Sequence, residues 1–309
     1  MNRVRNGPRY RAETDALLAT LPVDDGPMEL DDLVASRIES PDPRLTGPTR
    51  PVEACADVYL PLSGGPRRVR VYRDRPAPRP ILLWLHGGGF VGGSLDDIDA
   101  TCRALAATAG VVVVSLDYRL APEDPFPAAL DDTYDALSWL AEHGCVLGGD
   151  GRVAAGGQSA GANLVVAAAL RAREAGGPQV ECHVLAYPSL GVRQDSESFR
   201  LFDGVLFTKA DLAWNHEQYL AGQPVTPLVA PLTAPSLAGL PPALILAAGR
   251  DPLRDDARCY HQRLTDAGVG AQLVEYADTM HAFLNFPGVL SAAGDAVDDI
   301  AGYLAGVLG

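Results

Sequence analysis

Short, uninterrupted apolar segments alternate with helix-length segments along most of the chain, and this alternation limits the possible folds more than any other feature. Continuous apolar segments are typical of strands that are covered on both faces. Strand–helix–strand units with right-handed crossovers build a doubly wound, mostly parallel sheet. We therefore predict an α/β fold with strands at 81–86, 111–118, 152–157, 180–188, 243–249 and 271–276, and helices at 96–109, 127–142, 159–174, 254–267 and 291–307.

Residues 56–62 and 67–73 show a different pattern, because apolar and polar residues alternate within them. They are separated by Ser63-Gly64-Gly65-Pro66, which is a turn signal, and are predicted to form a β-hairpin. The expected sheet then has eight strands. Ligands of doubly wound sheets bind beyond the carboxyl ends of the strands. We therefore expect the functional residues in the loops that follow the strands.

Two parts of the chain interrupt the alternation. Residues 1–50 are polar and Pro-rich, and we expect a mobile arm with two short helices, Ala12–Leu21 and Met28–Ile38, and a solvated basic N-terminus. Residues 189–240 are a long, Pro-rich and aromatic segment between two strands, which is typical of a lid or binding insert. The expected organisation is an N-terminal segment, 1–50, and a main domain, 51–309, that carries the insert.

Composition excludes several classes of partner. A formal net charge of −14 repels phosphate backbones, so nucleic acid is not an expected partner. No run approaches the roughly 18 apolar residues of a membrane helix, and no signal peptide is visible. The five cysteines form no C-x-x-C pair, which argues against a zinc site or a disulfide framework and favours a reducing cytoplasm. Lys209 is the only lysine among 25 basic residues, a bias that indicates G+C-rich, bacterial coding.

The segment Gly157-Gln158-Ser159-Ala160-Gly161 joins an expected strand to an expected helix. Ser is a preferred N-cap, and in a chain with 32 glycines the pattern G-x-S-x-G also arises by chance. However, a strand-to-helix turn is also the setting of a nucleophile elbow, which exposes a serine Oγ at the top of the sheet. Side chains at 157 and 161 would collide with the neighbouring strand and helix. Ser159 is therefore a candidate nucleophile.

A serine hydroxyl needs a base, and the base needs a carboxylate to orient it. His281 is the candidate base because it follows the last strand, and four other histidines, at positions 143, 183, 216 and 261, are interpreted as structural or solvated. Asp251 lies two residues beyond the strand at 243–249, although it could instead cap the next helix. Three rival carboxylates remain, two expected on the solvent face of a helix and one on a loop: Asp255, Asp256 and Asp278.

The strand that begins at residue 81 runs into His86-Gly87-Gly88-Gly89-Phe90. Three consecutive glycines leave backbone N–H groups unobstructed, as an oxyanion-binding loop requires, and H-G-G-G is such a loop in lipases and esterases. A phosphate-binding loop is the alternative, but the P-loop pattern and the dinucleotide spacing are both missing. The chain order Ser, Asp, His is the order expected of an α/β-hydrolase.

With these motifs, the sequence resembles the hormone-sensitive-lipase-like family of α/β-hydrolases, particularly its bacterial carboxylesterases. The resemblance covers about residues 50–309 and is carried by HGGGF (86–90), DYRLAPEDPFPAALDD (117–132), GQSAGA (157–162), DPLRDD (251–256) and HAF (281–283). It implies a triad and an oxyanion hole formed by Ser159, Asp251 and His281 and by the N–H groups of Gly88, Gly89 and Ala160. It also implies that YRLAPE supports the oxyanion loop.

The resemblance further implies an α/β-hydrolase catalytic domain at 51–309, with a helical cap made of the N-terminal helices and the insert at 189–240. The implied activity is that of a serine carboxylesterase acting on small esters with short to medium acyl chains, without metal or cofactor. The alternatives are an amidase or arylformamidase, a small-metabolite deacetylase, and a non-catalytic receptor of the same fold. We expect a monomer or a homodimer, with the strand at 271–276 as a possible pairing edge. The aromatic candidates for substrate contact are Phe90, Phe202, Phe207 and Trp214.

The sequence departs from the family pattern beside the nucleophile and beside the base. Gln158 stands where an acidic residue or Thr is usual, and Ala162 and Ala282 stand where Gly is frequent. Gln158 is expected to change a hydrogen bond next to Ser159. Ala282 is expected to be tolerated unless its position needs a positive φ.

Overall fold

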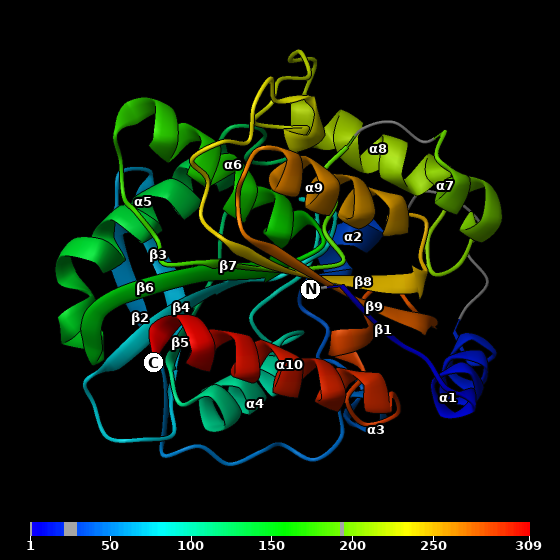
Figure 1. Cartoon of the computed structure of the whole chain (residues 1–309), viewed down its shortest axis with the longest axis horizontal. Coiled ribbons are helices and arrows are strands. Elements are labelled where there is room, and N and C mark those ends of the chain that lie inside the picture. The colour runs from blue at the N-terminus through cyan, green and yellow to red at the C-terminus, as the bar shows by residue number, and fades with distance from the viewer. Residues whose placement is uncertain (1, 22–29, 192–194) are drawn as a thin grey trace.

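A sheet of nine strands runs through residues 2–21, 30–191 and 195–309, the parts of the chain that the computed structural model describes (Figure 1). The order is β1-β9-β8-β7-β6-β4-β5-β3-β2, and only β5/β3 and β3/β2 are antiparallel. The mostly parallel α/β sheet is confirmed, whereas the predicted number of strands is wrong by one, the N-terminal β1. The strands are β1 (Arg3–Arg5), β2 (Ala54–Leu62), β3 (Gly65–Arg73), β4 (Arg79–Leu85), β5 (Val112–Leu116), β6 (Gly149–Gln158), β7 (His183–Ala186), β8 (Ala243–Arg250) and β9 (Ala271–Met280).

Helices cover both faces of this sheet (Figure 1). Helices α5, α6 and α9 lie on one face, and α4 and α10 lie on the other. No helix of the described residues is long and apolar enough to cross a bilayer. The helices are α1 (Pro8–Leu18), α2 (Leu30–Ser36), α3 (Pro43–Thr46), α4 (Asp99–Ala109), α5 (Ala128–His143), α6 (Ala160–Ala175), α7 (Glu197–Phe202), α8 (Lys209–Leu220), α9 (Arg254–Asp266) and α10 (Ser291–Leu308).

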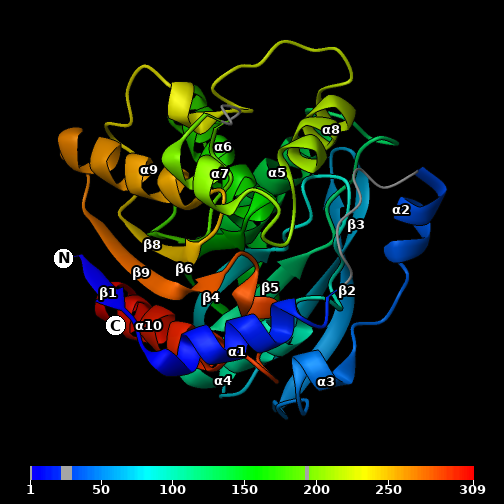
Figure 2. The same cartoon turned by 90° about the vertical axis from the view of Figure 1, so that its right-hand side faces the viewer.

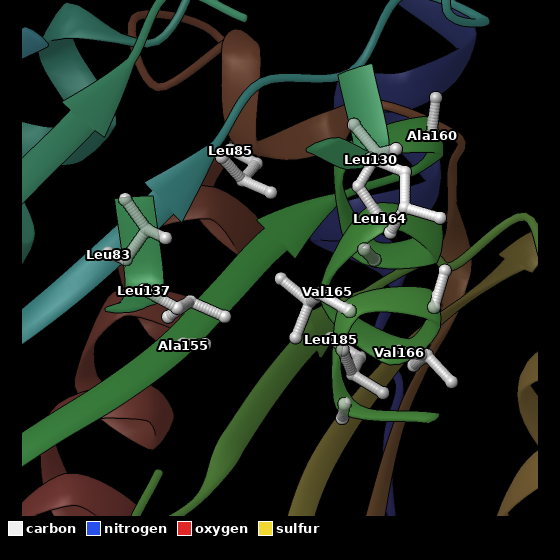
Figure 3. Packing of buried hydrophobic residues seen from close by; sticks show 14 of the residues in the cluster. Leu83, Leu85, Leu130, Leu137, Ala155, Ala160, Leu164, Val165, Val166 and Leu185 are labelled. Carbon is white, nitrogen blue, oxygen red and sulfur yellow. The ribbon is translucent and has the colours of Figure 1, made fainter. Parts of the chain in front are cut away.

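Strand β4 shows why the apolar segments are continuous. Residues 81–85 are at most 1% exposed, because alternate side chains enter two separate cores. Leu83 and Leu85 pack toward α6 (Figure 3), whereas Leu82 and Trp84 belong to the core beneath α4 and α10. Full burial of one such side chain contributes about 1.5–3 kcal/mol. The two cores hold the carboxyl ends of β4, β6, β8 and β9, which carry the candidate residues.

The start of the N-terminal arm is a strand of the sheet, which corrects the prediction of a mobile arm, whereas its basic side chains stay partly or largely exposed, as predicted. Residues 3–5 pair in parallel with Val274–Tyr276 of β9. Asp299 of α10 accepts hydrogen bonds from Arg3 at 3.0 Å and from Arg5 at 2.6 and 2.7 Å. Because β1 covers this edge of β9, the predicted pairing of two subunits through residues 271–276 would have to displace it.

The two predicted N-terminal helices exist, with shifted boundaries. The first begins four residues earlier than predicted, at Pro8, and α1 packs against β9 and α10. The start of the second, at residues 28–29, lies outside the described residues. Figure 2 shows α1 and the insert helices α7 and α8 on opposite sides of the sheet, so α1 is not part of a cap formed by the insert.

Candidate active site

Ser159 lies in the sharp turn between β6 and α6 and has a φ of 52° and a ψ of −117°. A non-glycine residue with such a positive φ is strained, and strain of this kind is concentrated at functional sites. The flanking glycines are needed for close packing: a Cβ on Gly157 would lie 2.6 Å from the Gly161 carbonyl carbon, and one on Gly161 would lie 2.7 Å from that of Leu85. The turn therefore holds Ser159 in one orientation, with its side chain partly exposed.

His281 and Asp251 complete a hydrogen-bonded chain with Ser159. The His281 Nε2 lies 2.9 Å from the Ser159 Oγ, and its Nδ1 lies 2.7 Å from the Asp251 Oδ2. His281 follows β9 directly, and Asp251 follows β8, so neighbouring strand ends bring the two side chains together. Asp251 is fully buried, and its second oxygen accepts the Leu253 N–H at 2.8 Å. Helix α9 begins at Arg254 with Leu253 as its N-cap and without a side-chain capping hydrogen bond, so Asp251 does not cap the helix and instead holds the turn before it.

The glycine loop lies opposite the nucleophile. A Cβ on Gly87 would lie 3.3 Å from the Ser159 Cβ, and Gly88 and Gly89 have φ values of 118° and 62°. Their N–H groups donate to no backbone carbonyl within the described ranges. The N–H of Ala160, the first residue of α6, has no partner in its own helix either. The three proposed oxyanion donors therefore retain their hydrogen-bonding capacity.

Residues of the YRLAPE segment support this loop from behind. The Tyr118 hydroxyl donates to the His86 carbonyl at 2.9 Å, and the two rings stack at 4.2 Å. The Ala121 N–H donates to the Phe90 carbonyl at 3.0 Å. Arg37, which sequence reasoning did not single out, donates to the carbonyls of Val91 and Ala121. These contacts agree with the supporting role that the resemblance implied.

The four aromatic candidates differ in what they contact. The Phe207 ring packs edge-on against the His281 ring, with centroids 5.1 Å apart. Phe202 lies beneath the Arg254 guanidinium, and Trp214 packs against the core on the α6 face. Phe90 is 1% exposed and stacks on Tyr219 of α8, so its ring has almost no surface to offer a ligand. Of the four, Phe207 is the one in contact with the triad.

Two of the three departures from the family pattern, Gln158 and Ala282, have visible consequences. The Gln158 Oε1 accepts a hydrogen bond from the Tyr187 hydroxyl, and the Tyr187 ring packs edge-on against His281 at 4.9 Å. Gln158 thus contacts the triad through Tyr187, a residue that sequence reasoning missed. Ala282 has a φ of 59°, so this position does need a positive φ, and an alanine there costs about 1–2 kcal/mol relative to glycine.

Asp256 is buried, which corrects its predicted place on the solvent face of α9. Its Oδ2 accepts the N–H groups of Leu190 and Gly191 at 2.9 and 2.8 Å, where the chain leaves β7. Asn163 of α6 holds the same region, because its amide donates to the carbonyls of Ser189 and Val229 at 2.7 and 2.9 Å. The two side chains fix the base of the insert next to Ser159. In the sequence, the only signal for Asn163 is that this polar residue directly precedes the apolar run LVVAAAL.

The other rival carboxylates are also engaged away from the histidine. Asp255 accepts the Ser198 N–H at 2.8 Å, and Asp278 accepts the Gly7 N–H at 3.3 Å. Of the four acidic residues considered, Asp251 is therefore the one hydrogen-bonded to His281.

Burial of Asp256 predicts an unusual dependence of stability on pH. Burial raises the pKa of its carboxyl to about 7, against roughly 4 in an unfolded chain. Between pH 4 and pH 7 the folded state therefore binds one proton more than the unfolded chain. The stabilisation from this proton is complete below about pH 4 and is lost as the pH rises through 7. Asp256→Asn keeps an acceptor for both N–H groups and removes the titration. Between pH 4.5 and 8, urea unfolding should show the wild type losing on the order of 3–4 kcal/mol relative to the variant. Parallel pH profiles for the two proteins would contradict this.

Comparisons with known proteins agree with this geometry. A family model of the α/β hydrolase fold matches residues 82–285. Esterase LipI of Mycobacterium tuberculosis is 40% identical over 81% of this chain and 81% of its own length. An ethyl acetate hydrolase of Pseudomonas putida is 37% identical over 74% of this chain and 75% of its own. The chain therefore belongs to the α/β-hydrolases, within their hormone-sensitive-lipase-like family.

The fold is also similar to that of solved enzymes. An esterase from Pyrobaculum calidifontis superposes with a TM-score of 0.83 at 36% sequence identity. The match covers 99% of this chain and 100% of that protein. The similarity thus extends over the arm and the insert as well as the sheet.

Proposed function

We propose that this chain is a serine carboxylesterase that hydrolyses short- to medium-chain esters through an acyl-enzyme. The observation that carries the proposal is His281, which lies at hydrogen-bonding distance from both the Ser159 Oγ and the Asp251 carboxylate. In this role His281 accepts the Ser159 proton as the Oγ attacks the ester carbonyl. Asp251 fixes the tautomer with the proton on Nδ1 and stabilises the imidazolium that forms. No metal or cofactor enters this scheme.

The remaining steps use the glycine loop and the same histidine. The N–H groups of Gly88, Gly89 and Ala160 donate to the oxygen that becomes negative in the tetrahedral intermediate. His281 then protonates the departing alcohol. During deacylation His281 deprotonates a water molecule, which attacks the acyl carbon and releases the acid and Ser159. Loss of one oxyanion donor typically lowers kcat by about 10²–10³-fold. A backbone N–H of the glycine loop is expected to contribute as much as a side-chain donor in the same position.

The insert supports a limit on acyl length. Phe207 packs on His281, and α8 stacks on the glycine loop through Tyr219 and Phe90. In this proposal the Phe207 ring, which lies against His281, limits the space beside the triad to a short acyl chain. The name of the Pseudomonas putida relative, an ethyl acetate hydrolase, agrees with such a preference.

A chain-length series tests the proposed activity. We expect kcat/KM for p-nitrophenyl esters to peak at acetate, butyrate or octanoate, and to fall at least about tenfold at palmitate, because burial of more methylenes needs a larger pocket. Initial rates at fixed enzyme concentration measure this. A maximum at palmitate would contradict the short-chain pocket, and the absence of turnover on every ester would contradict the proposed activity.

Three further proposals concern the organisation of the protein. We propose that residues 189–240 cap the catalytic domain at 51–309 and that residues 1–50 serve as an N-terminal segment.

We propose a cytoplasmic location, supported by five cysteines that are all free thiols, two of them buried. We propose a monomer or homodimer in which β1, and not a partner subunit, occupies the edge of β9.

A further inference from the structure

Helix α8 of the insert places a side-chain amide directly on the glycine loop. A Cβ built on Gly89 would lie 2.8 Å from the Asn215 Cγ and 3.3 Å from its Cβ. The Asn215 side chain therefore covers Gly89 in van der Waals contact, which also explains why this position accepts no larger residue. The contact joins the insert to the loop whose N–H groups are the proposed oxyanion donors.

The position of Asn215 is fixed by the packing of its helix. Tyr219, one turn further along α8, stacks on Phe90 with ring centroids 3.9 Å apart. The Tyr219 carbonyl accepts the Phe126 N–H at 2.7 Å. At its start, α8 has a capping box between Thr208 and Asp211. With both ends of the helix held in this way, the amide has a defined location relative to Gly89.

The Asn215 amide has hydrogen-bonding capacity that nothing in the described ranges uses. The side chain is partly buried, and it forms no hydrogen bond with another described residue. An amide offers two N–H donors and one carbonyl acceptor. A polar group at the wall of an acyl pocket weakens the binding of a plain hydrocarbon chain, unless the bound molecule supplies a partner.

We propose that Asn215 is a specificity-determining residue that selects esters whose acyl chain carries a hydroxyl or keto oxygen at C2 or C3. The inference rests on the proposed esterase function. If the Gly89 N–H holds the acyl carbonyl oxygen, a group in contact with Gly89 faces the carbons one or two bonds beyond that carbonyl. The amide donates to a keto oxygen there, and it can donate to or accept from a hydroxyl. The favoured substrates are therefore 2- or 3-oxygenated short-chain esters.

A matched set of ethyl esters tests the proposal, because chain length and leaving group stay constant. Ethyl butyrate, ethyl 3-hydroxybutyrate and ethyl 3-oxobutyrate are compared by pH-stat titration, with ethyl lactate against ethyl propionate for C2. In the wild type, kcat/KM should favour an oxygenated ester of at least one pair about tenfold, the value of one neutral hydrogen bond. Asn215→Leu should abolish that preference, mainly through KM for the oxygenated ester. Asn215→Asp, which cannot donate and whose negative charge lowers the turnover of every ester, should keep the preference for the hydroxy ester over the plain ester and lose that for the keto ester.

Glu217→Leu provides the matched control, because Glu217 is exposed on the same helix. The Glu217→Leu variant should leave the kcat/KM ratio of each oxygenated ester to its plain counterpart as in the wild type. A wild type that hydrolyses the plain esters without preference would overturn the role of Asn215 while leaving the esterase function intact. An Asn215→Leu variant that loses all substrates in equal proportion would overturn it too, since the residue would then only support the loop. A wild type without activity on any ester would overturn the proposed function itself.

Discussion

Ser159→Ala is expected to lower kcat by about 10⁴–10⁶ while leaving the fold intact. The variant removes the attacking Oγ but keeps a small side chain at a position whose φ of 52° tolerates little change. The residual activity comes from the oxyanion donors and from substrate binding, which do not need the hydroxyl. Steady-state hydrolysis of p-nitrophenyl butyrate measures the loss, and circular dichroism with thermal unfolding checks the fold.

A second serine shows whether the effect is specific. Ser138 lies in α5 and donates to the Tyr134 carbonyl at 2.9 Å, in a part of the molecule remote from the glycine loop. Ser138→Ala should change kcat less than about twofold. If Ser159→Ala retained wild-type turnover, the proposed nucleophile would be wrong.

Asp251→Asn is expected to lower kcat by about 10⁴. The amide keeps an oxygen for the Leu253 N–H, so the turn between β8 and α9 survives. Its NH₂ group would then face His281 Nδ1 and donate to it, which leaves the proton on Nε2. A protonated Nε2 cannot accept the Ser159 proton, so the base is lost although all the side chains remain in place. Single-turnover measurement of acylation should show that this step is the one slowed.

Asp278 is the control for this second effect, because it is close to His281 in sequence and hydrogen-bonds to Gly7 instead. Asp278→Asn should leave kcat within about twofold of the wild type. Equal losses in the two variants would show that the assignment of the orienting carboxylate to Asp251 is wrong.

Periodicity and turn chemistry were sufficient to predict the sheet, because each buried strand is continuously apolar and each is followed by a helix. The three-residue β1 could not be predicted in this way. Its sequence, Arg-Val-Arg, is polar, and it is held by pairing with β9 and by Asp299, which lies 294 residues from Arg5. A strand fixed by distant partners leaves no local pattern to read.

The candidate site was predictable for a related reason. Ser159, Asp251 and His281 each follow a strand, and strand ends meet at one edge of a parallel sheet. Asp256 and Asn215 were missed because their roles depend on contacts with the insert, whose path over the sheet is not encoded by periodicity. Asp256 has the helical context of a solvent-facing acid, and it is buried because the chain after β7 lies across it.

The central claim, that Ser159 is an activated nucleophile which becomes acylated, is tested most directly by mapping the adduct of a fluorophosphonate. Cleavage after Arg152 and Arg171 releases residues 153–171, in which Ser159 is the only serine. Mass spectrometry should find one phosphonyl group per chain on this peptide, formed more slowly in Asp251→Asn than in the wild type. An active enzyme that carries the label on another peptide, or takes up none, would contradict the claim.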